Sequence, residues 1–96
     1  MAKLWQDYQR EACASQGARE EGGPGKADCR LPDGQPVEVK AWNRKLTVAD
    51  VRRLIDDPKY RDQRLTICAP RGGYTRAAAR YALRRGARVK RCRLRR

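Results

Sequence analysis

Histidine is absent from the chain, and its four cysteines include no Cys-x-x-Cys pair. Because structural zinc sites are usually built from such pairs or from cysteine with histidine, we expect no structural zinc. Long apolar runs are also missing: no stretch approaches the roughly 18 apolar residues of a membrane span, and the N-terminus lacks the apolar centre of a secretory signal. These absences predict a cytoplasmic protein with no membrane partner.

The cysteines are far apart in the sequence, at Cys13, Cys29, Cys68 and Cys92. Three of them fall in runs that are typical of strands, where a free cysteine behaves as a small buried hydrophobe. Disulfides are rare in the cytoplasm. We therefore predict free, buried cysteines rather than disulfides.

Acidic side chains are absent from residues 71–96, which carry 11 basic ones, whereas residues 1–70 carry 13 basic and 11 acidic ones. The net charge of +13 is thus concentrated in the last quarter of the chain. Internal pairing cannot neutralise such a block, so an external polyanion is the expected partner, with DNA first and RNA as an alternative. The alternative is a solubilising tail or a contact with an anionic membrane.

The length of 96 residues supports one domain, spanning 1–96, with a modest core. Apolar periodicity and punctuation by glycine and proline predict seven elements. Helices are expected over 2–16, 47–57 and 76–85, and strands over 26–31, 36–41, 65–69 and 87–94. The order α-β-β-α-β-α-β predicts an α/β fold with a mixed β-sheet flanked by helices.

The strand over 36–41 carries the most informative pattern. Alternation sends Val37 and Val39 to one face and Glu38, Lys40 and the following Trp42 to the other. Asp28 lies on the partner strand of the same hairpin, so the turn can bring two acids and a lysine together. Two hard oxygen donors suit Mg²⁺ or Mn²⁺.

This cluster depends on the length of the hairpin loop. A symmetric two- or four-residue loop would set Asp28 opposite Val39, on the wrong face, whereas a three-residue loop over 33–35 would set it opposite Lys40. A metal site therefore predicts an odd loop or a bulge. Asp33 also precedes Glu38, but Asp followed by Gly is ordinary hairpin chemistry, so we assign Asp33 to the turn.

Together these residues resemble the PD-(D/E)xK nucleases, which share a restriction-endonuclease-like core, and within them the Mrr-type branch. The resemblance covers most of the chain. It rests on Asp28, Glu38-Val39-Lys40 with Trp42, the helix over 47–57, Gly73-Tyr74-Thr75 opening a helix with Ala78 and Ala82, and a last strand after Gly86. One departure is that Asp28 follows Ala27 and not the proline of the family's motif.

The resemblance implies a restriction-endonuclease-like sheet and a catalytic site in which Asp28 and Glu38 hold Mg²⁺ or Mn²⁺. Lys40 would orient or activate the attacking water and stabilise charge on the phosphate. Many family members add a glutamate from the first helix, for which Glu11 is the candidate. The alternative for Glu11 is an exposed ion pair with a neighbouring arginine.

Candidate nucleic-acid contacts follow from charge and position. Trp42 could stack on a base, although packing is its commoner role, and Thr75 is first a helix cap. The full set of candidates is Trp42, Arg71, Thr75, Arg76, Arg80, Arg84 and Arg85.

The sequence therefore favours a small, homodimeric, metal-dependent DNA endonuclease. One domain of this size carries one site, so cutting both strands or a branched junction would need two protomers. With no separate specificity domain, selection of DNA structure is expected rather than of a long sequence. The alternative is a non-catalytic, basic nucleic-acid-binding or mobile-element inhibitor protein on the same fold.

Overall fold

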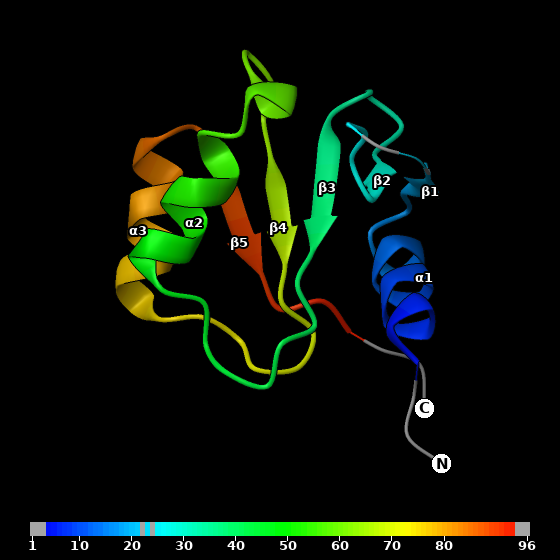
Figure 1. The fold of residues 1–96 in the computed structure, drawn as a ribbon, viewed down its shortest axis with the longest axis horizontal. Coiled ribbons are helices and arrows are strands. Elements are labelled where there is room, and N and C mark those ends of the chain that lie inside the picture. The colour runs from blue at the N-terminus through cyan, green and yellow to red at the C-terminus, as the bar shows by residue number, and fades with distance from the viewer. Residues whose placement is uncertain (1–3, 22, 24, 94–96) are drawn as a thin grey trace.

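A mixed sheet of five strands runs through the middle of this computed structural model, which describes residues 4–21, 23 and 25–93 (Figure 1). Residues 2, 3 and 94, which belong to the predicted first helix and last strand, lie outside the described residues. The elements are α1 (Trp5–Ser15), β1 (Arg19–Glu20), β2 (Cys29–Arg30), β3 (Pro36–Val39), α2 (Val48–Ile55), the 3-10 turn η1 (Pro58–Tyr60), β4 (Thr66–Cys68), α3 (Arg76–Arg84) and β5 (Arg88–Lys90).

The strands lie in the order β1-β2-β3-β4-β5, antiparallel from β1 to β3 and parallel from β3 to β5. The chain is thus a compact α/β domain with the order α-β-β-β-α-β-α-β among its described residues. The predicted mixed sheet is confirmed, but the predicted order missed β1. Both residues of β1 are exposed, so this strand has no apolar alternation that sequence reasoning could detect.

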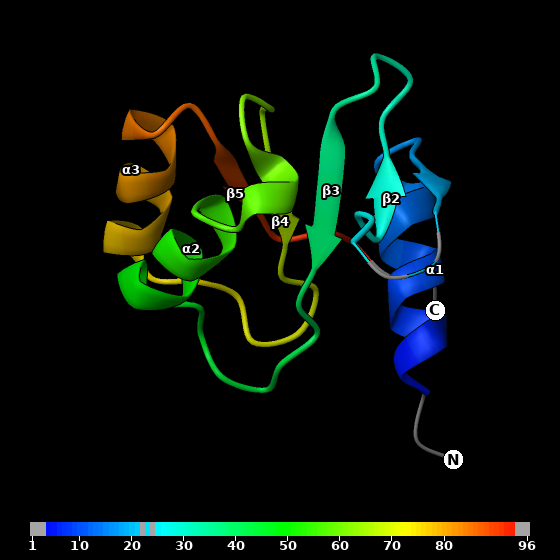
Figure 2. The ribbon, with the colours of Figure 1, turned by 45° about the horizontal axis from the view of Figure 1, so that its top comes forward.

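Each face of the sheet is covered by different helices (Figure 2). The face covered by α2 and α3 is called the helix-pair face. There Ile67 and Val89 share a buried cluster with residues of α2 and α3. On the α1 face, Val37 and Val39 pack with Ala12 and other buried residues. Figures 1 and 2 place α2 and α3 beside β5 and place α1 beside β2, at the other side of the sheet.

The predicted starts of α2 and α3 are confirmed by their caps. Thr47 and Asp50 form a reciprocal capping box at the start of α2, and Thr75 accepts a hydrogen bond of 3.0 Å from the backbone N–H of Ala78. At the start of α1 two apolar side chains stay in contact with solvent, because Leu4 and Trp5 are 66% and 44% exposed. No helix in the described part of the chain is long and apolar enough to cross a membrane.

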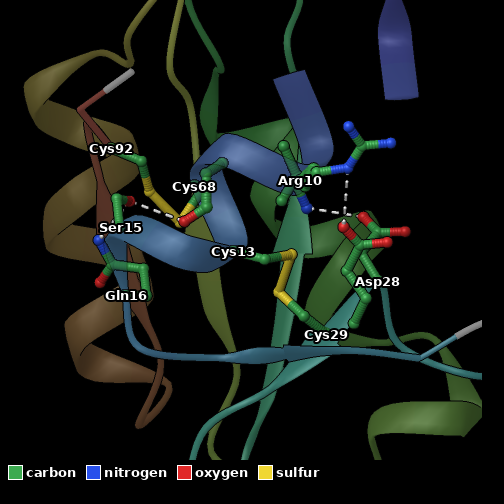
Figure 3. Close-up of a disulfide and its surroundings, with 11 residues drawn as sticks. Arg10, Cys13, Ser15, Gln16, Asp28, Cys29, Cys68 and Cys92 are labelled. Carbon is green, nitrogen blue, oxygen red and sulfur yellow. Dashed lines mark hydrogen bonds and ion pairs between the residues drawn. A yellow bond between two sulfur atoms is a disulfide. The ribbon is translucent and has the colours of Figure 1, made fainter. Parts of the chain in front are cut away.

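The prediction of free cysteines is wrong. Disulfides join Cys13 to Cys29 and Cys68 to Cys92, and all four residues lie in the buried cluster of the α1 face (Figure 3). The fold brings each pair of Cα atoms to 6.0 and 5.4 Å, within the usual range for a bridge. Separations of 16 and 24 residues gave no sign of this proximity in the sequence.

Candidate active site

The β2–β3 hairpin sets two acidic residues opposite each other. Cys29 pairs with Val37, and continuing this register places Asp28 opposite Glu38, on the same face of the sheet. The loop is odd, as a metal site required: residues 32–34 are closed by a hydrogen bond of 2.9 Å from the Leu31 N–H to the Gln35 carbonyl. The three-residue loop lies one position earlier than the 33–35 loop considered from the sequence, so Asp28 faces Glu38 and not Lys40, a two-residue shift that keeps the same face.

The turn chemistry explains this register. Asp33 accepts a hydrogen bond of 3.0 Å from the backbone N–H of Gln35, as an aspartate in a turn commonly does. Gly34 has a φ of 88°, a conformation that glycine adopts without steric cost. Asp33 therefore belongs to the turn, as predicted.

Glu38 is the centre of the cluster and is only 5% exposed. It pairs directly with Ile67 of β4, so its side chain lies on the helix-pair face. The Lys40 Nζ atom lies 3.2 Å from Oε2, the Lys59 Nζ atom lies 3.9 Å from Oε1, and the Tyr60 hydroxyl donates a hydrogen bond to Oε1. A buried carboxylate is thus surrounded by donors from two separate segments.

Asp28 is partly buried beside Glu38. Its Oδ2 atom accepts a hydrogen bond of 2.7 Å from the backbone N–H of Val39. Burial raises the pKa of Asp28, the Val39 hydrogen bond lowers it, and the negative charge of Glu38 raises it further. The lysines at 40 and 59 lower it less, so the pKa of Asp28 stays above its ordinary value. The predicted grouping of Asp28, Glu38 and Lys40 is therefore present.

Lys59 and Tyr60 were not predicted for this cluster. Both belong to η1, which follows α2 and begins with Pro58, and Asp57 caps this turn by accepting a hydrogen bond of 3.0 Å from the Lys59 N–H. Asp-Pro after an apolar helix signals a turn, but not the strand against which that turn packs. Only the tertiary fold identifies these two residues.

The carboxylates suit a hard divalent cation. Within the ranges that the structure describes, no group of three or more metal-ligating side chains gathers. Mg²⁺ commonly takes only one or two carboxylates and fills its remaining positions with water and phosphate oxygens. Asp28 and Glu38 provide two such groups, and their mutual repulsion is one that a cation would relieve. The residues therefore fit Mg²⁺ or Mn²⁺.

Glu11 lies on α1 and not on the hairpin that carries Asp28 and Glu38. Its neighbours Ala12 and Cys13 are buried in the α1-face cluster, whereas Glu38 lies on the helix-pair face. Glu11 itself is partly buried on α1. Its participation in the site stays a prediction.

Trp42 lies beyond the end of β3 and is half buried. The Lys40 Nζ atom is 5.5 Å and the Arg44 Cζ atom 4.4 Å from the centre of its ring. The Trp42 carbonyl accepts a hydrogen bond of 2.8 Å from the Gly72 N–H, and a Cβ atom at position 72 would collide with the Arg44 carbonyl. Trp42 therefore packs where two loops meet and carries cations on its ring.

The remaining candidate DNA contacts are spread over the surface. Thr75 is engaged as a cap, and the Arg71 guanidinium lies 5.0 Å from the centre of the Tyr8 ring. Arg85 pairs with Asp56 at 2.6 Å, so part of its charge is used within the protein. Three exposed arginines recur at helical spacing along α3: Arg76, Arg80 and Arg84. The helix that carries them packs on α2 and β5.

Comparisons of the chain with protein-family models, curated proteins and solved structures find no match. The residues of the site are therefore the basis for inferring a function.

Proposed function

We propose that this protein is a divalent-metal-dependent endonuclease that hydrolyses DNA phosphodiester bonds on a restriction-endonuclease-like core of the PD-(D/E)xK type. The observation that carries the proposal is the convergence of Asp28, Glu38 and Lys40 on one face of the sheet. The Lys40 Nζ atom lies 3.2 Å from Glu38, whose negative charge raises the pKa of Asp28. Two acids can hold a divalent cation that activates water, and a lysine beside them can stabilise charge on a phosphate.

Each residue has a distinct task. Asp28 and Glu38 would hold the cation, which supplies Lewis-acid activation of water and of the phosphate. Lys40, with a side chain 24% exposed, can face both Glu38 and a phosphate, so that it orients the attacking water and stabilises charge on the phosphate oxygens. The Val39 N–H keeps Asp28 oriented through its 2.7 Å hydrogen bond.

The charge distribution supports nucleic acid as the substrate. The chain carries 24 basic and 11 acidic side chains, and long-range attraction of this kind concentrates polyanions at the surface. Because one domain offers one such site, we propose that a homodimer acts on both strands or on branched DNA. RNA is the alternative substrate.

A specific observation favours the alternative, a non-catalytic nucleic-acid-binding protein. Lys40, Lys59 and Tyr60 already supply Glu38 with two cations and a hydroxyl donor. A carboxylate satisfied in this way can be purely structural. The two functions differ in whether a divalent metal ion enables the protein to cleave DNA.

The test compares the parent protein with Glu38→Ala on supercoiled, single-stranded and four-way-junction DNA, with and without Mg²⁺ or Mn²⁺. Glu20→Ala is the matched control, because it removes a glutamate from the same sheet at an exposed position. Parallel assays on RNA identify the preferred nucleic acid.

We expect the parent and Glu20→Ala to cut only with metal, and Glu38→Ala not to cut. Salt-sensitive DNA binding without cleavage by any of the three proteins would establish the binding module instead. Equal cleavage by Glu38→Ala and the parent would contradict the assignment of this cluster as the catalytic site.

A further inference from the structure

We propose that Tyr60 is a positioning residue of the active site, whose buried hydroxyl fixes the Glu38 carboxylate in the orientation needed to bind a divalent cation. This inference rests on the proposed metal-dependent function. It extends the site from the β2–β3 hairpin to η1, a segment that the sequence did not connect with it.

Tyr60 is placed rigidly. The residue is 3% exposed and lies in the core cluster of the helix-pair face together with Val51 and Leu65. Its backbone N–H donates a hydrogen bond of 2.9 Å to the Asp57 carbonyl, and the Asp57 side chain caps the same turn. Because the ring is packed in the core, its orientation is fixed, and its hydroxyl donates to Glu38 Oε1.

The hydroxyl is a dependable donor. It donates to Glu38 Oε1 within the core, and a tyrosine hydroxyl, with an ordinary pKa of about 10, is protonated at physiological pH. A neutral donor holds a carboxylate without cancelling its charge, whereas an ammonium group competes with a metal ion for it. Tyr60 can therefore stay bound to Glu38 when a cation arrives.

The contacts of Glu38 divide between its two oxygens. Tyr60 donates to Oε1, and the Lys40 Nζ atom lies nearest to Oε2. Without the hydroxyl, the carboxylate is free to turn toward Lys59, whose Nζ atom is already 3.9 Å from Oε1. Tyr60 thus opposes a rotation that would bring the Glu38 carboxylate closer to Lys59, with which it already forms a long ion pair.

The experiment measures Mn²⁺ binding by electron paramagnetic resonance in the full chain, without DNA. Tyr60→Phe removes the hydroxyl and keeps the ring in the core. Tyr81→Phe is the matched control, because it removes a hydroxyl that contacts Arg85 and not Glu38. Melting curves in the absence of metal show that each variant is folded at the assay temperature.

We expect Tyr60→Phe to weaken Mn²⁺ binding by about 10–100-fold, as is typical when a partner of a metal ligand is lost, and Tyr81→Phe to leave it unchanged. A purely structural Tyr60 would give a lower melting temperature with parental Mn²⁺ affinity, and that result overturns the inference. The proposed function fails separately if the parent binds no Mn²⁺ or if Glu38→Ala binds it equally well; either result removes the inference too.

A second variant covers a folding failure of Tyr60→Phe. Fluorotyrosine at position 60 keeps the hydroxyl, adds one fluorine atom to the ring and strengthens the hydroxyl as a donor. A change in Mn²⁺ affinity larger than that caused by the same substitution at position 81 supports the positioning role, and an equal effect at the two positions overturns it.

Discussion

Asp50 and Asp28 are two carboxylates that the fold removes from water to different degrees, and their environments are opposite. Asp50, 6% exposed, accepts hydrogen bonds of 2.6 and 3.1 Å from Arg44 and one of 2.8 Å from the Thr47 N–H. The Arg44 hydrogen bond is the main reason that the pKa of Asp50 is well below its ordinary value. Asp28 has a raised pKa because burial and Glu38 outweigh the Val39 N–H.

This difference separates a structural carboxylate from a candidate functional one. The Asp50 carboxylate accepts hydrogen bonds from Arg44 and from Thr47, the N-cap of α2. A metal ion bound to Asp50 would displace these donors. Asp28 is left beside a second acid, an arrangement that costs folding free energy and that a bound cation would relieve. Perturbed carboxylates of the second kind cluster at active sites.

The largest expected effect is on catalysis. Lys40→Ala removes the cation nearest to Glu38 Oε2 and should lower the rate of metal-dependent DNA cleavage by about 10²–10³-fold, the usual loss when one electrostatic group is removed. Binding of DNA, measured by fluorescence anisotropy, should change little. The matched control is Lys45→Ala, an exposed lysine after the same strand, which should cut at the parental rate. Equal losses of cleavage and binding in Lys40→Ala would contradict its catalytic role.

The next effect is on stability and belongs to Asp50. Asp50→Ala removes the capping box of α2 and should lower the free energy of unfolding by about 1–2 kcal/mol. For a domain of this size, that loss lowers Tm by roughly 5–15 °C, which calorimetry can measure.

Two checks accompany the Asp50 variant. Asp56→Ala removes a 52% exposed partner of Arg85 and should shift Tm far less. Metal-dependent cleavage by Asp50→Ala should equal that of the parent while both are folded. A loss of cleavage under those conditions would erase the distinction between the two carboxylates.

Asp28 should affect the pH dependence of folding stability in the opposite direction to Asp50, because the pKa of Asp28 is raised and that of Asp50 is lowered. Because its folded-state pKa is raised above 3.8, ionised Asp28 destabilises the fold, and this penalty is absent at low pH and complete above the raised pKa. Asp28→Asn retains an acceptor for the Val39 N–H. We therefore expect Asp28→Asn to be at least as stable as the parent at neutral pH, with the advantage vanishing below pH 3.8, in melts recorded across this range. An advantage that grows as the pH falls would show that the sign is wrong.

The smallest effect concerns two adjacent arginines on the surface. Arg85 is engaged by Asp56 and Tyr81, whereas Arg84 is exposed on α3. If α3 contacts DNA, Arg84→Ala should reduce the slope of log affinity against log salt by about one, and Arg85→Ala by less. Equal slopes for both variants and the parent would place the DNA away from α3.

Features that depend on neighbouring residues could be predicted from the sequence, whereas features that depend on packing could not. Short-range patterns predicted the capping box at Thr47 and Asp50, the turn at Asp33 and the face shared by Glu38 and Lys40, because these depend on residues within a few positions. For the hairpin, a metal site required an odd loop or a bulge, but the sequence did not determine which residues pair across the two strands. Lys59 could not be foreseen, since its contact with Glu38 depends on how the chain returns after α2.

The sequence by itself determined the starts of α2 and α3, the alternation along β3 and the excess of positive charge, since each is set by neighbouring residues or by composition. Tertiary structure alone decided the pairing of the cysteines, the addition of β1 at the sheet edge and the delivery of Tyr60 to Glu38 across 22 positions. The physical reason is that long-range contacts depend on how elements pack, and a local pattern does not specify which face or edge another segment will meet.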